Sequence, residues 1–277
     1  MGTGGCGETG GVPEGDTIFR AAERLRPVLA GATVVRFEAP RLVGARPWPG
    51  TRIDAVEALG KHLLIHFDGG LSLRTHMRMT GSWHVYRAGE RWRKPAYLAR
   101  VVIDVDSGWT AVCFSAPIVE TYQRAAGTRA LAALGPDLCR PDSLEADVLD
   151  AVVARLADLA EPDTEVGVAL LDQRIAAGIG NVFKSEACFA VGLDPFTPIA
   201  ALDVAARREL WATAARQLRA NLGPGRRTTH PRGLAVYRRA GRSCHTCGTP
   251  IRMKRQGEQQ RSTYWCPRCQ LRPAPPG

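Results

Sequence analysis

The spacing of hydrophobic residues divides the chain into a β-rich first half and a helical second half. Near the N-terminus, apolar residues at helical spacing predict a helix over residues 16–26 that ends at Pro27. Short apolar runs between Gly- and Asp-rich turns then predict strands over residues 34–37, 62–67, 71–74, 101–105 and 109–114. We therefore expect the N-terminal part to be an antiparallel β-sandwich, or a barrel, with one leading helix.

Beyond about residue 135 the hydrophobic period changes from that of strands to that of helices. Helices are predicted over residues 143–159, 165–172, 182–191 and 203–222. The fold class expected from this order is α+β. We expect domains over residues 13–134, 135–225 and 235–272, after a Gly-rich, disordered extension over residues 1–12.

The composition is that of a soluble globular protein. Of the 277 residues, 45% are hydrophobic and 23% are charged, so the chain can bury a sizeable core. No run approaches the roughly 20 apolar residues that a membrane span needs, and no secretory signal is visible. These observations predict a cytoplasmic protein.

Positive charge is concentrated at the C-terminal end. From Gly223 onward the chain has 12 Lys or Arg residues and one acid, Glu258, which gives this part a net charge of +11. Because the whole chain carries +10, residues 1–222 sum to −1. A solvated charged tail is one interpretation. Binding to phosphate is the stronger one, because clustered Lys and Arg displace counterions from nucleic acid.

Four of the eight cysteines form a metal-binding pattern. The pairs Cys244/Cys247 and Cys266/Cys269 are two C-x-x-C motifs separated by 18 residues, the arrangement of a four-sulfur zinc site on a hairpin. A redox dithiol is the alternative for a single C-x-x-C motif. His245 lies between two better-placed cysteines and is expected to face solvent. The remaining cysteines are expected to be free thiols, and three of them to lie in the core: Cys113, Cys139 and Cys188.

Three separated segments resemble the formamidopyrimidine-DNA glycosylase/endonuclease VIII family. They are Pro13–Asp16 before the first helix, Leu171–Asn181, which is similar to that family's helix–two-turn–helix, and Gln260–Gln270, which is similar to the second half of its zinc finger. The resemblance runs from Pro13 to about Leu271 in the order of the family. It implies a DNA-repair enzyme that removes damaged bases and then cleaves the strand at the abasic site, with one structural zinc ion and damaged, double-stranded DNA as partner. We expect a monomer by default, because nothing in the sequence indicates an oligomer, and a location in the bacterial cytoplasm in association with the nucleoid.

The resemblance makes Pro13 the nucleophile. A free N-terminal proline is a secondary amine that can attack C1′ of the damaged nucleotide, form a Schiff base and allow β,δ-elimination. Within a chain, however, the proline nitrogen is an amide. We therefore expect that residues 1–12 come from a mis-assigned start, with Val12 as the true first residue, removed to expose Pro13. The alternative is that Pro13 only precedes a helix.

The family pattern assigns roles to further residues. Glu14 is expected to be a proton donor or relay, or to stabilise a cationic intermediate; its alternative is a helix-terminal acid. Lys61 is expected to contact DNA phosphate and assist β-elimination, although a strand-end lysine is otherwise the simpler interpretation. Asn181 begins a helix whose N–H groups suit a phosphate. Arg261 is expected to bind the phosphate beside the lesion and to support δ-elimination.

The segment 76–83 occupies the place of the family's intercalation loop. Met79 is the expected wedge in the gap left by the extruded base, and Arg78 is expected to contact the orphaned base or the backbone. Met77 and Trp83 are expected to be core residues. The segment 114–120 lacks the Arg and Phe wedges of purine-directed members. This difference favours the endonuclease VIII branch and oxidised pyrimidines.

Two other classes of protein compete with this enzyme. If Pro13 is not the mature N-terminus, the chain would be a catalytically silent DNA-binding protein of the same fold. A zinc-ribbon RNA-binding or transcription factor is a weaker alternative, because it leaves Pro13, Glu14, Lys61 and Arg261 unexplained together.

Overall fold

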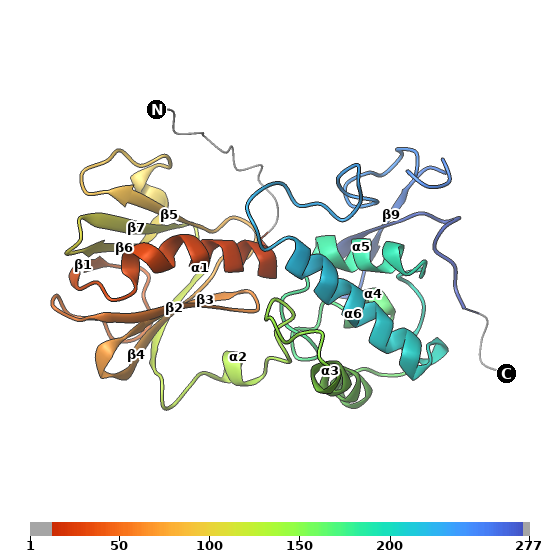
Figure 1. Cartoon of the computed structure of the whole chain (residues 1–277), viewed down its shortest axis with the longest axis horizontal. Coiled ribbons are helices and arrows are strands. Elements are labelled where there is room, and N and C mark those ends of the chain that lie inside the picture. Colours follow the sequence, from red (N-terminus) through yellow and green to blue (C-terminus); the bar gives the residue numbers. More distant parts are fainter. Residues whose placement is uncertain (1–12, 274–277) are drawn as a thin grey trace. The chain divides into compact units, whose positions relative to one another are not determined.

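The structure is a computed structural model that describes residues 13–273. The chain forms two compact units (Figure 1). The first unit comprises residues 15–133, and the second comprises residues 134–273 together with Pro13 and Glu14.

The first unit contains two antiparallel sheets of four strands each. One sheet has the order β1-β6-β7-β5 and is built from Val34–Glu38, Ala99–Val105, Trp109–Phe114 and Ser82–Arg87. The other has the order β2-β3-β4-β8 and is built from Ile53–Leu59, His62–Phe67, Leu71–His76 and Ile118–Gln123. The short helical turns η1 (Asp68–Gly70) and η2 (Ala96–Leu98) connect strands, and the short helix α2 (Arg129–Ala132) follows the last strand, β8. The expected sandwich and the α+β class are confirmed.

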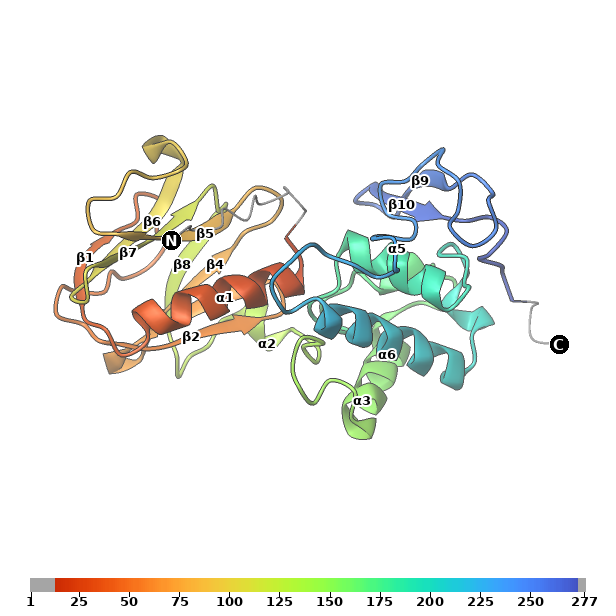
Figure 2. The ribbon, with the colours of Figure 1, turned by 45° about the horizontal axis from the view of Figure 1, so that its top comes forward.

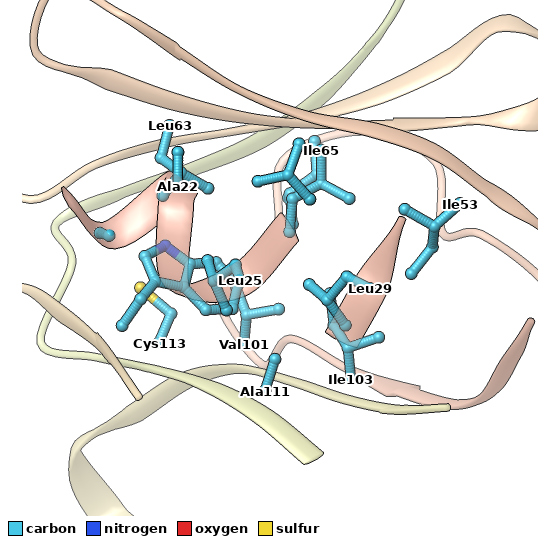
Figure 3. Packing of buried hydrophobic residues seen from close by; sticks show 14 of the residues in the cluster. Ala22, Leu25, Leu29, Ile53, Leu63, Ile65, Val101, Ile103, Ala111 and Cys113 are labelled. Atoms are coloured by element: carbon cyan, nitrogen blue, oxygen red, sulfur yellow. The ribbon is translucent and has the colours of Figure 1, made fainter. Parts of the chain in front are cut away.

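Helix α1 (Gly15–Leu29) supplies the centre of this unit's core. Figure 3 shows its residues Ala22, Leu25 and Leu29 among side chains from both sheets. The helix continues past Pro27, where the sequence predicted its end. Because Pro27 lies in the last turn, the missing N–H costs only one backbone hydrogen bond.

The second unit is helical at its centre. Its elements are α3 (Ala146–Leu159), α4 (Val166–Ala169), α5 (Asn181–Ala190), η3 (Ile199–Ala201) and α6 (Val204–Ala220). Helix α6 packs against α3 and α5. The helix predicted over residues 165–172 is a single turn, α4, followed by a tight turn that leads to α5. The Gln173 side chain closes that turn, donating to the Ile179 carbonyl at 3.0 Å and accepting from the Gly178 N–H at 3.1 Å.

The unit ends in a two-stranded hairpin. Strands β9 (Arg252–Gln256) and β10 (Arg261–Trp265) are antiparallel, and β10 packs against α5 (Figure 2). Within residues 13–273, no helix combines the length and the apolar character that a membrane span requires.

Candidate functional site

The four predicted zinc ligands converge on one point. The Sγ atoms of Cys244, Cys247, Cys266 and Cys269 all lie within 4.8 Å of one another. Two of these separations are 3.8 Å, between Cys244 and Cys269, and 3.4 Å, between Cys247 and Cys266. A tetrahedral zinc ion with Zn–S bonds of about 2.3 Å requires S···S separations of about 3.8 Å. The cluster therefore fits one structural zinc ion, as the sequence predicted.

The surroundings favour the thiolate at one of the four ligands, whereas burial raises the pKa of Cys266 and Cys269. Hydrogen bonds from Thr249 lower the pKa of Cys247 to about 6, and zinc binds the thiolate form. His245 is half-buried and stacks on His230 with ring centroids 4.8 Å apart, so it is not the solvent-facing residue that the sequence predicted. The other three described cysteines, Cys113, Cys139 and Cys188, are buried core residues, as expected.

Replacing Cys247 with Ser is expected to remove the zinc ion and unfold the hairpin, because metal binding supplies most of the folding free energy of so small a module. Affinity for DNA should fall at least ~10-fold, since the hairpin carries much of the basic charge. Zinc content by atomic absorption and a DNA-binding titration would measure both effects. Cys113→Ala is the control and should keep its zinc. A Cys247→Ser protein that binds DNA as wild type does would contradict this role of the metal.

The N-terminus of α5 binds the Glu14 carboxylate. Glu14 is fully buried and accepts backbone N–H bonds from Gly180 at 3.1 Å, Val182 at 2.7 Å and Phe183 at 3.3 Å. These donors, together with the positive end of the helix dipole, stabilise a negative charge on the carboxylate. The sequence predicted that the N–H groups beside Asn181 would face a phosphate. Glu14 occupies them instead.

Gly180 is required for this arrangement. A Cβ atom at residue 180 would lie 2.3 Å from Cδ of Glu14. Only glycine therefore allows the carboxylate to approach the helix so closely. Because Pro13 directly precedes Glu14, the contact between Glu14 and α5 also holds the predicted nucleophile close to the N-terminus of this helix.

Helix α5 also holds the strand that begins with Arg261. The Asn181 side-chain amide donates to the Ser262 carbonyl at 2.6 Å, and Lys184 Nζ donates to Thr263 Oγ1 at 2.6 Å. Arg261 itself is exposed next to the hairpin turn and donates to Gln259 Oε1 at 2.9 and 3.1 Å. Glu14, Asn181 and Arg261 are thus tied to one helix.

Lys184 is a buried cation that the sequence analysis did not select. Burial lowers its pKa to about 8. Thr263 Oγ1 accepts from Lys184 and donates to Gln256 Oε1 at 2.7 Å, and Gln256 Nε2 donates to Glu165 Oε2 at 2.9 Å. A hydroxyl and an amide thereby connect the ammonium group to a carboxylate. A lysine on the apolar face of a predicted helix was the sequence feature that could have indicated this buried cation.

Glu186, on the same helix, holds a second segment. Its carboxylate accepts the backbone N–H groups of Ala235, Val236 and Tyr237 at 2.7 to 2.9 Å and is buried. Tyr237 in turn packs its ring against Tyr264 of β10. This contact pattern has no local sequence signature, because the paired residues are about 50 positions apart.

The other predicted site residues belong to the first unit. Lys61 is half-buried in the turn between β2 and β3, where Leu59 pairs with His62. Burial and the neighbouring cations lower the pKa of His62 to about 3 and that of His76 to about 4. Both rings are therefore neutral at neutral pH. His62 Nδ1 faces Arg74 Nη1 at 3.1 Å and must be the acceptor, so its proton is on Nε2.

Arg78 and Met79 are exposed in the loop between β4 and β5. Arg78 has a φ of +44°, and 57% of the Met79 surface is exposed. Gly81 closes the loop, because its N–H donates to the Met77 carbonyl at 2.8 Å and a Cβ atom there would lie 2.7 Å from Met77 Cα. Met77 and Trp83 are buried, as the sequence predicted.

Sequence models of three protein families match consecutive parts of the chain. The formamidopyrimidine-DNA glycosylase N-terminal domain matches residues 12–116, the H2TH domain of the same enzymes matches residues 139–231, and the zinc finger found in FPG and IleRS matches residues 243–272. Together with the two sheets, the helical unit and the four-cysteine hairpin, these matches define a zinc-finger DNA glycosylase.

Individual relatives narrow this class. The chain is 43% identical to the probable endonuclease 8 2 of Streptomyces coelicolor, over 95% of this chain and 96% of that protein. It is 38% identical to the DNA-(apurinic or apyrimidinic site) lyase Nei2 of Mycolicibacterium smegmatis, over 94% and 99%. The chain belongs to the formamidopyrimidine-DNA glycosylase/endonuclease VIII family, in its endonuclease VIII-like branch.

Solved structures share the fold. The MutM (Fpg) protein of Thermus thermophilus superposes with a TM-score of 0.74 at 28% identity, covering 93% of this chain and 98% of that chain. Lactococcus lactis Fpg, solved with DNA containing an abasic site, superposes with a TM-score of 0.79 at 17% identity, covering 93% and 99%.

Proposed function

We propose that the protein is a bifunctional DNA glycosylase and abasic-site lyase of base excision repair that uses Pro13 as its nucleophile. The observation that carries the proposal is the position of Glu14. The buried carboxylate directly after Pro13 is anchored by three backbone N–H groups on the helix that also holds the Arg261 strand. One helix therefore fixes an acid next to the nucleophile and an arginine for the departing phosphate.

The reaction begins at the free amine of Pro13. An α-amino group has a pKa of about 8, so a useful fraction is unprotonated near neutral pH. The nitrogen lone pair attacks C1′ of the damaged nucleotide, and the C1′–base bond breaks with its electrons leaving on the base. Loss of the ring C–O bond then gives an iminium ion. This cation acidifies the C2′ proton, and removal of that proton expels the 3′ phosphate. Loss of the C4′ proton from the resulting conjugated iminium then expels the 5′ phosphate. Water finally hydrolyses the iminium and frees the amine.

The remaining residues support these steps. The three N–H groups that donate to Glu14 favour its ionised form over its protonated form. As a carboxylate, Glu14 stabilises the iminium cation and accepts protons, and it does not begin the reaction as a proton donor. Lys61 contacts phosphate and assists the first elimination. Asn181 holds the Arg261 strand, Arg78 contacts the orphaned base or the backbone, and Met79 fills the gap left by the extruded base.

The parts of the chain divide this work. We assign residues 13–134 to the catalytic domain, residues 135–225 to DNA binding and residues 235–272 to the zinc finger that presents Arg261. The partner is damaged double-stranded DNA, bound by a monomer in the bacterial cytoplasm. Oxidised pyrimidines are the preferred lesions, because the segment 114–120 lacks large wedge side chains. Cleavage of duplexes with thymine glycol or 8-oxoguanine would test that preference, and faster cleavage at 8-oxoguanine would reverse it.

Arg261→Ala is expected to keep the first elimination and lose the second. A guanidinium that binds the leaving phosphate stabilises its developing charge, so δ-elimination product should fall ~10-fold or more while the borohydride adduct persists. Gel separation of the two product termini measures the ratio. Arg252→Ala, which removes an exposed arginine opposite Trp265 at the other end of the same hairpin, should leave the ratio unchanged. An unaltered ratio in Arg261→Ala would remove Arg261 from the mechanism.

A further inference from the structure

Three loops meet at one end of the β1-β6-β7-β5 sheet. Ser82 at the start of β5 and Ala99 at the start of β6 both pair with Phe114 at the end of β7. The loops before β5, before β6 and after β7 therefore lie side by side. Strand spacing places the first and second of these loops about 10 Å apart, with the third between them.

Hydrogen bonds connect the three loops. The Ser115 N–H donates to the Leu98 carbonyl at 2.8 Å, and Thr80 Oγ1 donates to the Ser115 carbonyl at 3.4 Å. Residue 115 thus links the turn η2 on one side with the Met79 loop on the other. The three loops form one continuous edge of the first unit.

The three loops of this edge differ in the size of the side chains that they expose. Ser115 is half-buried and Ala116 is buried, so Pro117 is the exposed side chain there. On either side lie Met79, 57% exposed, and Tyr97, 78% exposed. A large apolar and a large aromatic side chain are therefore exposed on either side of a loop that exposes a small one.

The backbone at Tyr97 is fixed although its ring is exposed. Tyr97 is the middle residue of η2, and its carbonyl accepts from Arg100 Nη1 at 3.0 Å. Below this turn, Trp92 packs edge-on against Phe114 with ring centroids 5.8 Å apart. Residues 90–100 carry four cations and one acid: Arg91, Arg93, Lys94, Arg100 and Glu90. An exposed aromatic ring on a fixed backbone turn, in a segment rich in cations, is the composition of a surface that stacks on a nucleic-acid base.

We infer that Tyr97 stacks on the base left unpaired opposite the lesion while Met79 fills the gap in the damaged strand. This inference rests on the proposed function, because only base extrusion leaves a partner base without a mate. Stacking of an aromatic side chain on a base stabilises a complex by about 1–3 kcal/mol. The middle loop, which exposes Pro117, has no large exposed side chain for this contact. Tyr97 is the exposed aromatic residue of the adjoining loop at the same edge.

Tyr97→Ala tests the inference in a duplex with an uncleavable abasic analogue opposite 2-aminopurine. The dissociation constant should rise about tenfold, which corresponds to 1.4 kcal/mol, and the 2-aminopurine should be brighter in the complex because its stacking is lost. Tyr97→Phe should keep the wild-type affinity and quenching. Trp48→Ala is the matched control, since Trp48 is 79% exposed and lies near Val34, at the far end of β6.

Three results would overturn the assignment. They are wild-type affinity and quenching in Tyr97→Ala, an equal loss in Trp48→Ala, and a larger loss in Pro117→Ala than in Tyr97→Ala. A single-stranded abasic oligonucleotide, which has no opposite base, separates the two proposals. In a chain that begins at Pro13, Tyr97→Ala should leave the yield of borohydride adduct on this oligonucleotide unchanged. Absence of any adduct between the unsubstituted Pro13-start chain and an abasic-site duplex would instead refute the proposed function itself.

Discussion

A chain that begins at Pro13 is expected to form a borohydride-stable adduct with abasic-site DNA, and a chain that begins at Met1 is expected to form none. The difference is all-or-none, because the nitrogen of an internal proline is an amide without a nucleophilic lone pair. Glu14 is bound to α5 by its side chain, so a free amine at residue 13 leaves its three hydrogen bonds available. Denaturing gel electrophoresis of labelled DNA after borohydride reduction measures the adduct.

The matched control for this experiment keeps one extra residue. A chain that retains Val12 is longer by only one residue, but the Pro13 nitrogen in it is an amide and not an amine. This chain should therefore form no adduct. DNA binding by this form should persist, since the zinc hairpin is unchanged. Equal adduct from the Met1 form would place the nucleophile elsewhere. Adduct from none of the three forms would favour the catalytically silent DNA-binding protein.

Glu14→Gln is expected to reduce base excision by ~10²–10⁴-fold, the range for a positioned acid–base group. The amide loses the negative charge that stabilises the iminium ion, and its NH2 group faces backbone donors that the carboxylate satisfied. Excision from an oxidised-pyrimidine duplex should fall more than cleavage at a preformed abasic site, because the second substrate has already lost its base. Single-turnover rates on the two duplexes measure the difference.

Gly180→Ala disturbs the same contact from the opposite side. The added methyl group would lie 2.3 Å from Cδ of Glu14, so the carboxylate must leave the helix terminus although its charge is kept. Excision should therefore fall in this variant as well, and thermal unfolding shows how much of the loss is due to stability. Wild-type excision in Glu14→Gln would show that the carboxylate has no part in the chemistry.

Local patterns in the sequence were sufficient to predict the metal site and five of the eight strands of the first unit, whereas β2, β5 and β8 were not predicted. The two C-x-x-C motifs predicted the four-sulfur cluster, because ligand spacing within each pair is a local property. Strand patterns predicted the hairpin of β3 and β4 for the same reason. Pro27 was interpreted as a helix end, but packing of α1 between the sheets carries the helix to Leu29.

The partners of α5 could not be predicted from the sequence. Glu14 contacts residues 166 to 169 positions away, and Lys184 contacts a residue 79 positions away. Helix-terminal N–H groups donate equally well to a phosphate or a carboxylate, so the local pattern did not distinguish a DNA contact from Glu14. The distinction came from the steric requirement at Gly180, which only the folded chain shows.

The anchoring of Glu14 on α5 also sets an order of events during synthesis. The residues of the first unit, 15–133, leave the ribosome before α5 exists, whereas Glu14 has no binding site until residues 180–183 have emerged. For the time needed to add those residues, at roughly 5–20 per second, the segment around Pro13 stays accessible. The N-terminal processing that the proposed nucleophile requires can therefore take place before the carboxylate is buried, while the chain is still being translated.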